Sequence, residues 1–186
     1  TRTFNMGDGT WTMTTPAVTP WDQGTITNLT FNSNASTLVI APSSARSAQA
    51  LLILGAGLTY NAITINDFAL TATQGRRPLI ISSATNTITT FSITNGYWIK
   101  FANSTTVITN GFTYNGASGA TILISSASDN GSATLSVGGT VLLSWAAFQN
   151  IIKSGAGTIT ATNSFDLGGN TGVSISLPPS SRIISG

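Results

Sequence analysis

The chain has 186 residues, of which 41% are apolar and 6% are charged, and its formal net charge is +2. This composition suits one folded domain with a core and excludes a disordered polar tail, a dense basic track for nucleic acid and a membrane-spanning run. Because the chain has no Cys, His or Glu, disulfides, thiolate or imidazole metal sites and His-dependent triads are also excluded. Its polar residues are mainly 31 Thr, 23 Ser and 15 Asn, which predicts an all-β protein with many corners.

Residues 1–24 are predicted to form an N-terminal capping segment. The alternation in Thr10–Met13 predicts a strand, and Trp11 and Trp21 lie close to this end of the chain. A stack of strands needs such a cover, because its last layer otherwise exposes core side chains and unpaired backbone groups. The two Trp side chains are therefore expected to close the apolar end of the stack.

A four-residue strand pattern recurs along the chain, with an apolar residue, a small polar one, an apolar one and then a small residue. The copies start at Leu29, Ile63, Phe91, Phe112, Leu135 and Ile159, and the first interval is the longest. Period-two alternation predicts strands with one buried side, and their regular return predicts stacked turns. Ile65 and Ile93 are expected inside, and Thr64 and Ser92 outside.

Two further sets of strands are expected between these copies. One set is nearly continuously apolar: Leu51–Leu54, Leu79–Ser82, Ile122–Ser125 and Val141–Ser144. The other set comprises Thr37–Ile40, Phe68–Leu70 and Trp98–Phe101. The near copies 80–84 and 123–127 are separated by two turns of a coil, if each turn takes roughly 21 residues. Three strands per turn predict a right-handed parallel β-helix over residues 25–177.

The corners between these strands are rich in Gly, Asn and Ser. Examples are Gly55–Gly57, Asn115-Gly116, Gly138-Gly139 and Gly155–Gly157. Asn-Gly corners are also typical of hairpins, so an antiparallel β-sandwich is the alternative fold. The recurrence of similar strands with similar corners favours translation along an axis, and hence the β-helix.

One short helix and one exit segment complete the predicted elements. The Ala-rich stretch from Ser43 to Leu54 offers a helical insertion of one or two turns, which the long first interval between Leu29 and Ile63 would accommodate. Pro178-Pro179 blocks further ladder pairing, so residues 178–186 are expected to leave the stack.

An ordered set of short motifs resembles a module of large proteins of tailed bacteriophages and environmental bacteria. The motifs are Phe4–Gly7, Gly9–Thr12, Trp21-Asp22, Asn28–Asn32, Gly55–Asn61, Val141–Trp145 and Asp166–Gly172. The chain departs from the pattern in its stretch 43–50 and at Val173, where an aromatic residue is usual. The resemblance covers most of residues 3–175 and implies a β-helical protein of the virion surface or tail, without catalytic residues.

A search for catalytic chemistry finds five carboxylates, none close to another in sequence. They are Asp8, Asp22, Asp67, Asp129 and Asp166. Glycoside hydrolysis needs two carboxyl groups about 5–10 Å apart, and a calcium site needs several that converge. We therefore interpret Asp67, Asp129 and Asp166 as corner residues, and expect no catalytic residue, metal or cofactor.

Aromatic rings stack on sugars, and the pair Tyr97-Trp98 is the candidate contact for a glycan or a neighbouring subunit. Adjacent strand residues point to opposite sides, so one of the two should face outward. The leading hypothesis is a non-enzymatic structural protein of a phage particle (surface, fibre, tail or capsid decoration). It would form a homo-oligomer, plausibly a trimer, and would contact other virion proteins and host surface glycans. The alternatives are a bacterial cell-surface adhesin passenger and a polysaccharide-degrading enzyme.

Overall fold

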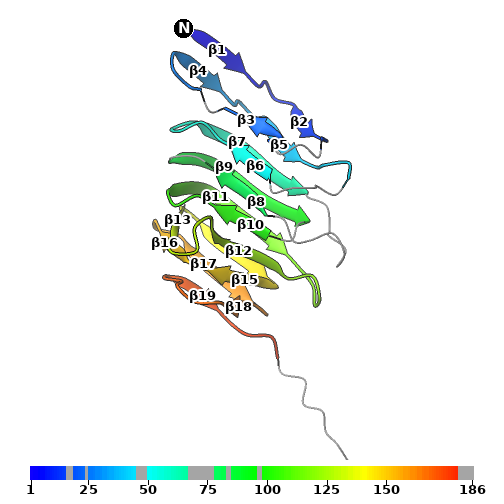
Figure 1. The fold of residues 1–186 in the computed structure, drawn as a ribbon, viewed down its shortest axis with the longest axis vertical. Coiled ribbons are helices and arrows are strands. Elements are labelled where there is room, and N and C mark those ends of the chain that lie inside the picture. Colours follow the sequence, from blue (N-terminus) through cyan, green and yellow to red (C-terminus); the bar gives the residue numbers. More distant parts are fainter. Residues whose placement is uncertain are drawn as a thin grey trace, which may run out of the picture.

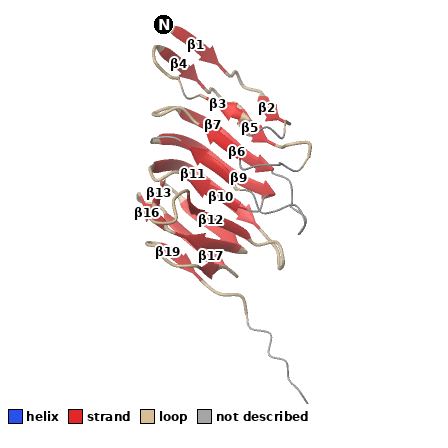
Figure 2. Ribbon diagram, viewed as in Figure 1, coloured by secondary structure: helices blue, strands red, loops and turns tan. Residues whose placement is uncertain are grey.

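A computed structural model describes residues 1–15, 19–23, 25–44, 50–66, 78–82, 85–95 and 98–179, and in these ranges the chain is all-β with no helix. The strands follow one another down the long axis of the molecule (Figures 1 and 2). Their bounds are β1 Arg2–Asn5, β2 Thr10–Met13, β3 Trp21–Asp22, β4 Leu29–Asn32, β5 Thr37–Ile40, β6 Ala50–Ile53, β7 Thr59–Asn66, β8 Leu79–Ser82, β9 Asn86–Asn95, β10 Trp98–Phe101, β11 Thr105–Asn115, β12 Ile122–Ser126, β13 Ala133–Val137, β14 Thr140–Ser144, β15 Ala146–Gln149, β16 Ile151–Ser154, β17 Thr158–Thr162, β18 Phe165–Asp166 and β19 Val173–Ile175.

Every pairing between the described strands is parallel. A two-stranded sheet joins β1 and β4, and a seven-stranded sheet has the order β18-β15-β12-β10-β8-β6-β3. A ten-stranded sheet has the order β19-β17-β14-β11-β9-β7-β5-β2, with β13 and β16 as a branch from β11. The antiparallel β-sandwich is therefore wrong for these strands, and the Asn-Gly corners are not hairpin turns.

The chain passes repeatedly from the ten-stranded to the seven-stranded sheet and back, and it enters the two-stranded sheet only at β1 and β4. β1, β2 and β3 are followed by β4, β5 and β6, and each strand of the second group pairs with its counterpart in the first. The passes differ in length: the stretch from Leu52 to its register partner Ile81 is much longer than the stretch from Val141 to its partner Ile159. The repeat is thus variable, and the constant turn length expected from the near copies holds only for some passes.

The core lies between the sheets. Along the strands of the ten-stranded sheet, buried residues that face the core alternate with residues that face outward. Ile65 and Ile93 are 0% and 3% exposed, while Thr64 and Ser92 are half-buried on the other side, which confirms the predicted register. Phe91 packs against Phe112 in the next strand, with ring centroids 5.1 Å apart. Phe91 also lies 5.8 Å from Phe101 of the seven-stranded sheet, so one aromatic cluster joins the two sheets.

Close backbone packing explains some of the glycine corners. A Cβ on Gly138 would lie 2.6 Å from the carbonyl oxygen of Thr109, and one on Gly157 would collide with the carbonyl oxygen of Gly139. Three successive passes therefore stack at this corner with no room for a side chain, because real Cβ atoms do not approach a carbonyl so closely. The prediction of corners at Gly138-Gly139 and Gly155–Gly157 is confirmed.

Three predictions about individual strands need correction or lie outside the described residues. The recurring pattern does not fill one ladder: the copy at Leu29 pairs with β1, and Leu135 is the register partner of Thr106 in β11 and Lys153 in β16 rather than of another copy. The predicted helix is wrong at its C-terminal end, where residues 50–53 form β6. Its residues 45–49, like the predicted strand Phe68–Leu70, lie outside the described residues.

The first strands carry a group of aromatic side chains. Phe4 lies 5.7 Å from Trp11, 6.2 Å from Trp21 and 5.9 Å from Phe31, measured between ring centroids. β1 pairs with β4 and β3 pairs with β6, so these residues continue the pairing of the strands that follow. The role of residues 1–24 as a cap stays a prediction.

Candidate functional site

Trp98 stands on the outer side of β10, between the buried positions of the core. Ile99 and Phe101 are both fully buried, while Trp98 and Lys100 alternate with them and are half-buried. The Nε1 of Trp98 donates a hydrogen bond of 2.8 Å to Oγ of Ser125 in β12. Trp98 therefore faces outward, as one member of the pair was predicted to do, and its ring is held by the next strand. Tyr97 lies outside the described residues.

Lys100 is two positions further along the same outer side and interacts with the Trp98 ring. Its Nζ lies 4.4 Å from the ring centroid and 3.8 Å from Oδ1 of Asp129, which is in the turn after β12. The Lys100 side chain is 13% exposed, against 95% for Asp129. A cation over an indole face is attracted by the ring quadrupole. Lys100 thus occupies one face of the ring, and that face is not open to a sugar.

The carboxylates of the described residues are tied to nearby backbone or side chains. Oδ1 of Asp166 accepts hydrogen bonds from the amide of Gly168 at 2.8 Å and from Nδ2 of Asn170 at 2.6 Å. Oδ1 of Asp8 accepts the amide of Ala35 at 3.3 Å. Asp129 lies in a turn, as predicted, whereas Asp166 is the last residue of β18; Asp67 lies outside the described part of the chain. Within that part, no three acidic side chains group closely enough to hold a metal ion.

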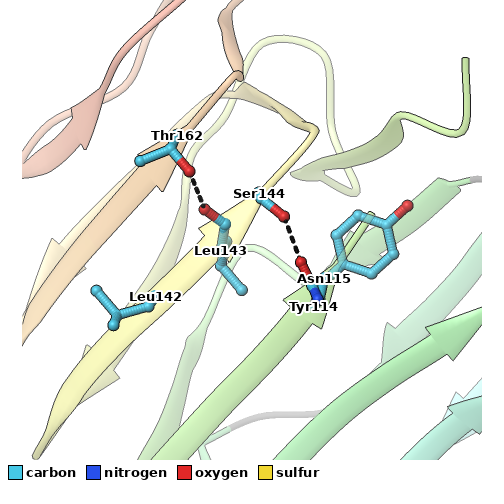
Figure 3. A pocket seen from close by; sticks show the side chains of 6 residues that line it. All are labelled: Tyr114, Asn115, Leu142, Leu143, Ser144 and Thr162. Carbon is cyan, nitrogen blue, oxygen red and sulfur yellow. Dashed lines mark hydrogen bonds between the residues drawn. The ribbon is translucent and has the colours of Figure 1, made fainter. Parts of the chain in front are cut away.

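A surface pocket of about 320 Å³ lies across β11, β14 and β17 (Figure 3). Its lining consists of Tyr114, Asn115, Leu142, Leu143, Ser144 and Thr162. Figure 3 shows the polar side chains at one end and Leu142 at the other, and Leu142 is 67% exposed. The lining contains no carboxylate and no cation, and its one titratable side chain is Tyr114, so the pocket offers mainly shape and hydrogen bonds.

Hydrogen bonds within this pocket hold its polar end in place. Oγ of Ser144 donates to Oδ1 of Asn115 at 2.8 Å, and Oγ1 of Thr162 donates to the carbonyl of Leu143 at 3.5 Å. The hydroxyl of Tyr114 donates to the carbonyl of Ala120, and burial raises the pKa of this hydroxyl above its ordinary value. Tyr114 is therefore neutral at physiological pH and acts as a fixed structural donor.

Sequence reasoning found Trp98 but missed its partners and the pocket. Lys100 could have been predicted as a neighbour of Trp98, because residues two apart on a strand share one side. Ser125 and Asp129 could not have been predicted, since their position near Trp98 depends on which strand follows β10 in the ladder. The pocket residues come from three strands and carry no shared motif, so no local signal could have grouped them.

Comparison of the chain with protein-family models, curated proteins and solved structures finds no match. In the described residues, no helix has the length and apolar content required to cross a bilayer.

Proposed function

We propose that the chain is a non-enzymatic structural module of a bacteriophage particle, built as a right-handed parallel β-helix. The observation that carries the proposal is that the chain passes again and again from the ten-stranded to the seven-stranded sheet, and that all the described strands pair in parallel. A chain that returns to the same two sheets along one axis is a rod with long side surfaces. Such a rod suits assembly and surface contact better than it suits an enclosed active site.

The right-handed winding rests on a general rule for parallel strands. Connections between parallel strands of one sheet are right-handed in about 98% of cases, because the twist of the strands favours that crossing. Each ladder here contains only parallel neighbours, so every pass requires such a connection. The assignment to the virion surface or tail rests on the sequence resemblance, which covers most of residues 3–175.

Partners of the module would be further copies of the chain, other virion proteins and a host surface glycan. Charged residues make up only 6% of the chain, and this low fraction favours assembly over solvation of an isolated rod. For the glycan, Trp98 offers one ring face, because Lys100 occupies the other. Glycan contact thus depends on a single residue. The binding of Trp98→Ala and of the wild-type chain to an array of host polysaccharides would be compared to test it.

The test of the main proposal is the location of the chain in purified particles. We expect peptides of the chain in density-banded phage particles by mass spectrometry, and antibodies against it should label their surface in electron micrographs. Recovery only from the bacterial cell-surface fraction would contradict the proposal and support the adhesin. Release of reducing sugar by the purified chain, lost in Asp129→Asn, would contradict the non-enzymatic part.

A further inference from the structure

The seven-stranded sheet differs from its neighbour in having apolar residues on both sides. β6, β8 and β12 contain the apolar runs Leu51-Leu52-Ile53, Leu79-Ile80-Ile81 and Ile122-Leu123-Ile124. The middle residue of the run points inward in β6 (Leu52) and outward in β12 (Leu123), so each side of the sheet carries apolar residues. Leu52, Leu79, Ile81, Ile122 and Ile124 are fully buried in the core. Parallel strands that are apolar on both sides are typical of sheets covered on both faces. The outer side of this sheet therefore has the composition of a buried surface.

The outward apolar residues form one continuous line across the strands, which we call the apolar strip. It comprises Leu51, Ile80, Trp98, Leu123, Ala147 and Phe165. Direct register partners link Leu51 with Ile80, Trp98 with Leu123, Leu123 with Ala147 and Ala147 with Phe165. Ile80 pairs with Lys100, so the step from Ile80 to Trp98 is a diagonal one, which side chains of this size can bridge.

In the single chain the apolar strip is only partly covered. Ala147 is 8% exposed and Phe165 is 38% exposed, and the other four members are half-buried. The charged residue on this side of the same strands is Lys100, which is paired with Asp129 and covered by Trp98. Covering the apolar strip would therefore remove apolar surface from water, and it would not bury an unpaired cation of these strands.

We propose that the apolar strip is the surface through which a second copy of this chain packs against the first. Neighbouring strands are about 4.8 Å apart, so the side chains of the apolar strip repeat at that interval along the axis. Sheets pack face to face by interdigitating their side chains, and a partner with the same repeat fits this arrangement along its length. A second copy has this repeat and the same paired Lys100 on the described strands of the apolar strip. The inference rests on the homo-oligomer part of the proposed function and deepens it, and it makes Trp98 a subunit contact in place of a glycan contact.

Charges placed on the apolar strip provide the first test. We expect the purified full chain to sediment as an oligomer in analytical ultracentrifugation, and Ile80→Glu/Leu123→Glu to sediment with the mass of a single chain. The matched control is Thr90→Glu/Thr113→Glu, which places two charges on the outer side of β9 and β11, where both residues are exposed. The control should remain oligomeric. A wild-type chain that is still monomeric at millimolar concentration would overturn the proposal.

Two further variants keep the test decisive if the Glu variants fail to fold. Ile80→Thr/Leu123→Thr uses the residue that the neighbouring sheet already carries outside, and should weaken self-association at least tenfold with an unchanged circular dichroism spectrum. Because the chain has no cysteine, Leu123→Cys should cross-link to a second chain with a bis-maleimide, whereas Thr113→Cys should not. Equal cross-linking of both, or none at Leu123→Cys in a confirmed oligomer, would refute the assignment. The particle test does not bear on this result, since a monomeric chain can still belong to a virion.

Discussion

The ten-stranded and seven-stranded sheets both have apolar inner sides, but their outer sides differ in polarity. On the ten-stranded sheet, Thr12, Val39, Thr64, Ser92 and Thr113 are register partners on the outer side, and the hydroxyl oxygens of Thr64 and Ser92 are 2.9 Å apart. On the seven-stranded sheet, the outer side carries the apolar strip. Inner apolar residues are common to both, so the core holds the stack together while the outer residues determine what each surface can contact.

The largest expected effect concerns the inner sides, where the two sheets should behave alike. Ile93→Asp in the ten-stranded sheet and Ile99→Asp in the seven-stranded sheet each place a carboxylate at a position that is 3% or 0% exposed. We expect each to lower the free energy of unfolding by more than about 4 kcal/mol. Urea denaturation followed by circular dichroism measures this. Ser92→Asp, one residue away and facing outward, should cost less than about 1 kcal/mol. Equal midpoints for Ile93→Asp and wild type would refute the register.

The second prediction concerns a hydrogen bond that joins the two sheets through the core. Nε1 of Trp21 in β3 donates to the hydroxyl of Tyr60 in β7 at 3.4 Å. Burial raises the pKa of Tyr60 from 10.0 to about 12, while the bonds with Trp21 and the Gly55 backbone act in the lowering direction. The folded chain therefore holds this proton more tightly than the unfolded chain does.

Stability should consequently fall with rising pH in alkaline solution. The contribution of Tyr60 is fully present below pH 10, and on the order of 2–3 kcal/mol is lost as the pH rises from about 10 to 12. Denaturation curves at pH 8 to 12 measure the loss, and Tyr60→Phe should remove most of it. Tyr114, whose pKa is also raised, leaves a smaller residual slope. An unchanged alkaline loss in Tyr60→Phe would contradict the assignment.

The third prediction addresses a corner where the chain passes from the ten-stranded to the seven-stranded sheet. Ser164 is fully buried; its Oγ accepts the amide of Ala146 at 3.0 Å and donates to the carbonyl of Thr162 at 2.8 Å. Ser164→Ala leaves a buried amide without a partner and should cost about 1–3 kcal/mol in thermal denaturation. Ser174→Ala, at an exposed position of β19, is the control and should be neutral. Equal melting temperatures for both variants would show that the corner amide has another partner.

The smallest effect is expected at Trp145, another corner between the two sheets. Trp145 has φ +56°, and the other non-glycine residues with positive φ among those described are all Asn: Asn28, Asn34, Asn150 and Asn163. A bulky residue in this conformation is strained by about 1–3 kcal/mol. Trp145→Asn relieves that strain but removes a half-buried ring, so we expect a net change within about 1 kcal/mol in calorimetry. Trp145→Val keeps the strain and should be clearly destabilised. A loss above about 3 kcal/mol in Trp145→Asn would instead show that the ring is essential to packing.

Much of the local structure could be predicted from the sequence. The alternation in Ile63–Ile65 and Phe91–Ile93 correctly separated inner from outer residues, because a strand has a strict period of two. Continuous apolar runs correctly located β6, β8 and β12. The near copies 80–84 and 123–127 were correctly placed two passes apart, although their register is offset: Leu79 and Ile80, rather than Ile81 and Ser82, align through β10 with Ile124 and Ser125.

The composition and strand periodicity of this chain determined an all-β protein with an apolar inside and a hydroxyl-rich outside. Only the tertiary structure decided which ladder each strand joins, how Lys100 and Asp129 meet at Trp98, and which outer side remains apolar. The physical reason is that the sequence of a strand shows which of its side chains share a side, but it does not show which other strand pairs with it. Passes of unequal length, such as those before Ile81 and Ile159, bring residues together by ladder pairing rather than by a constant spacing along the chain.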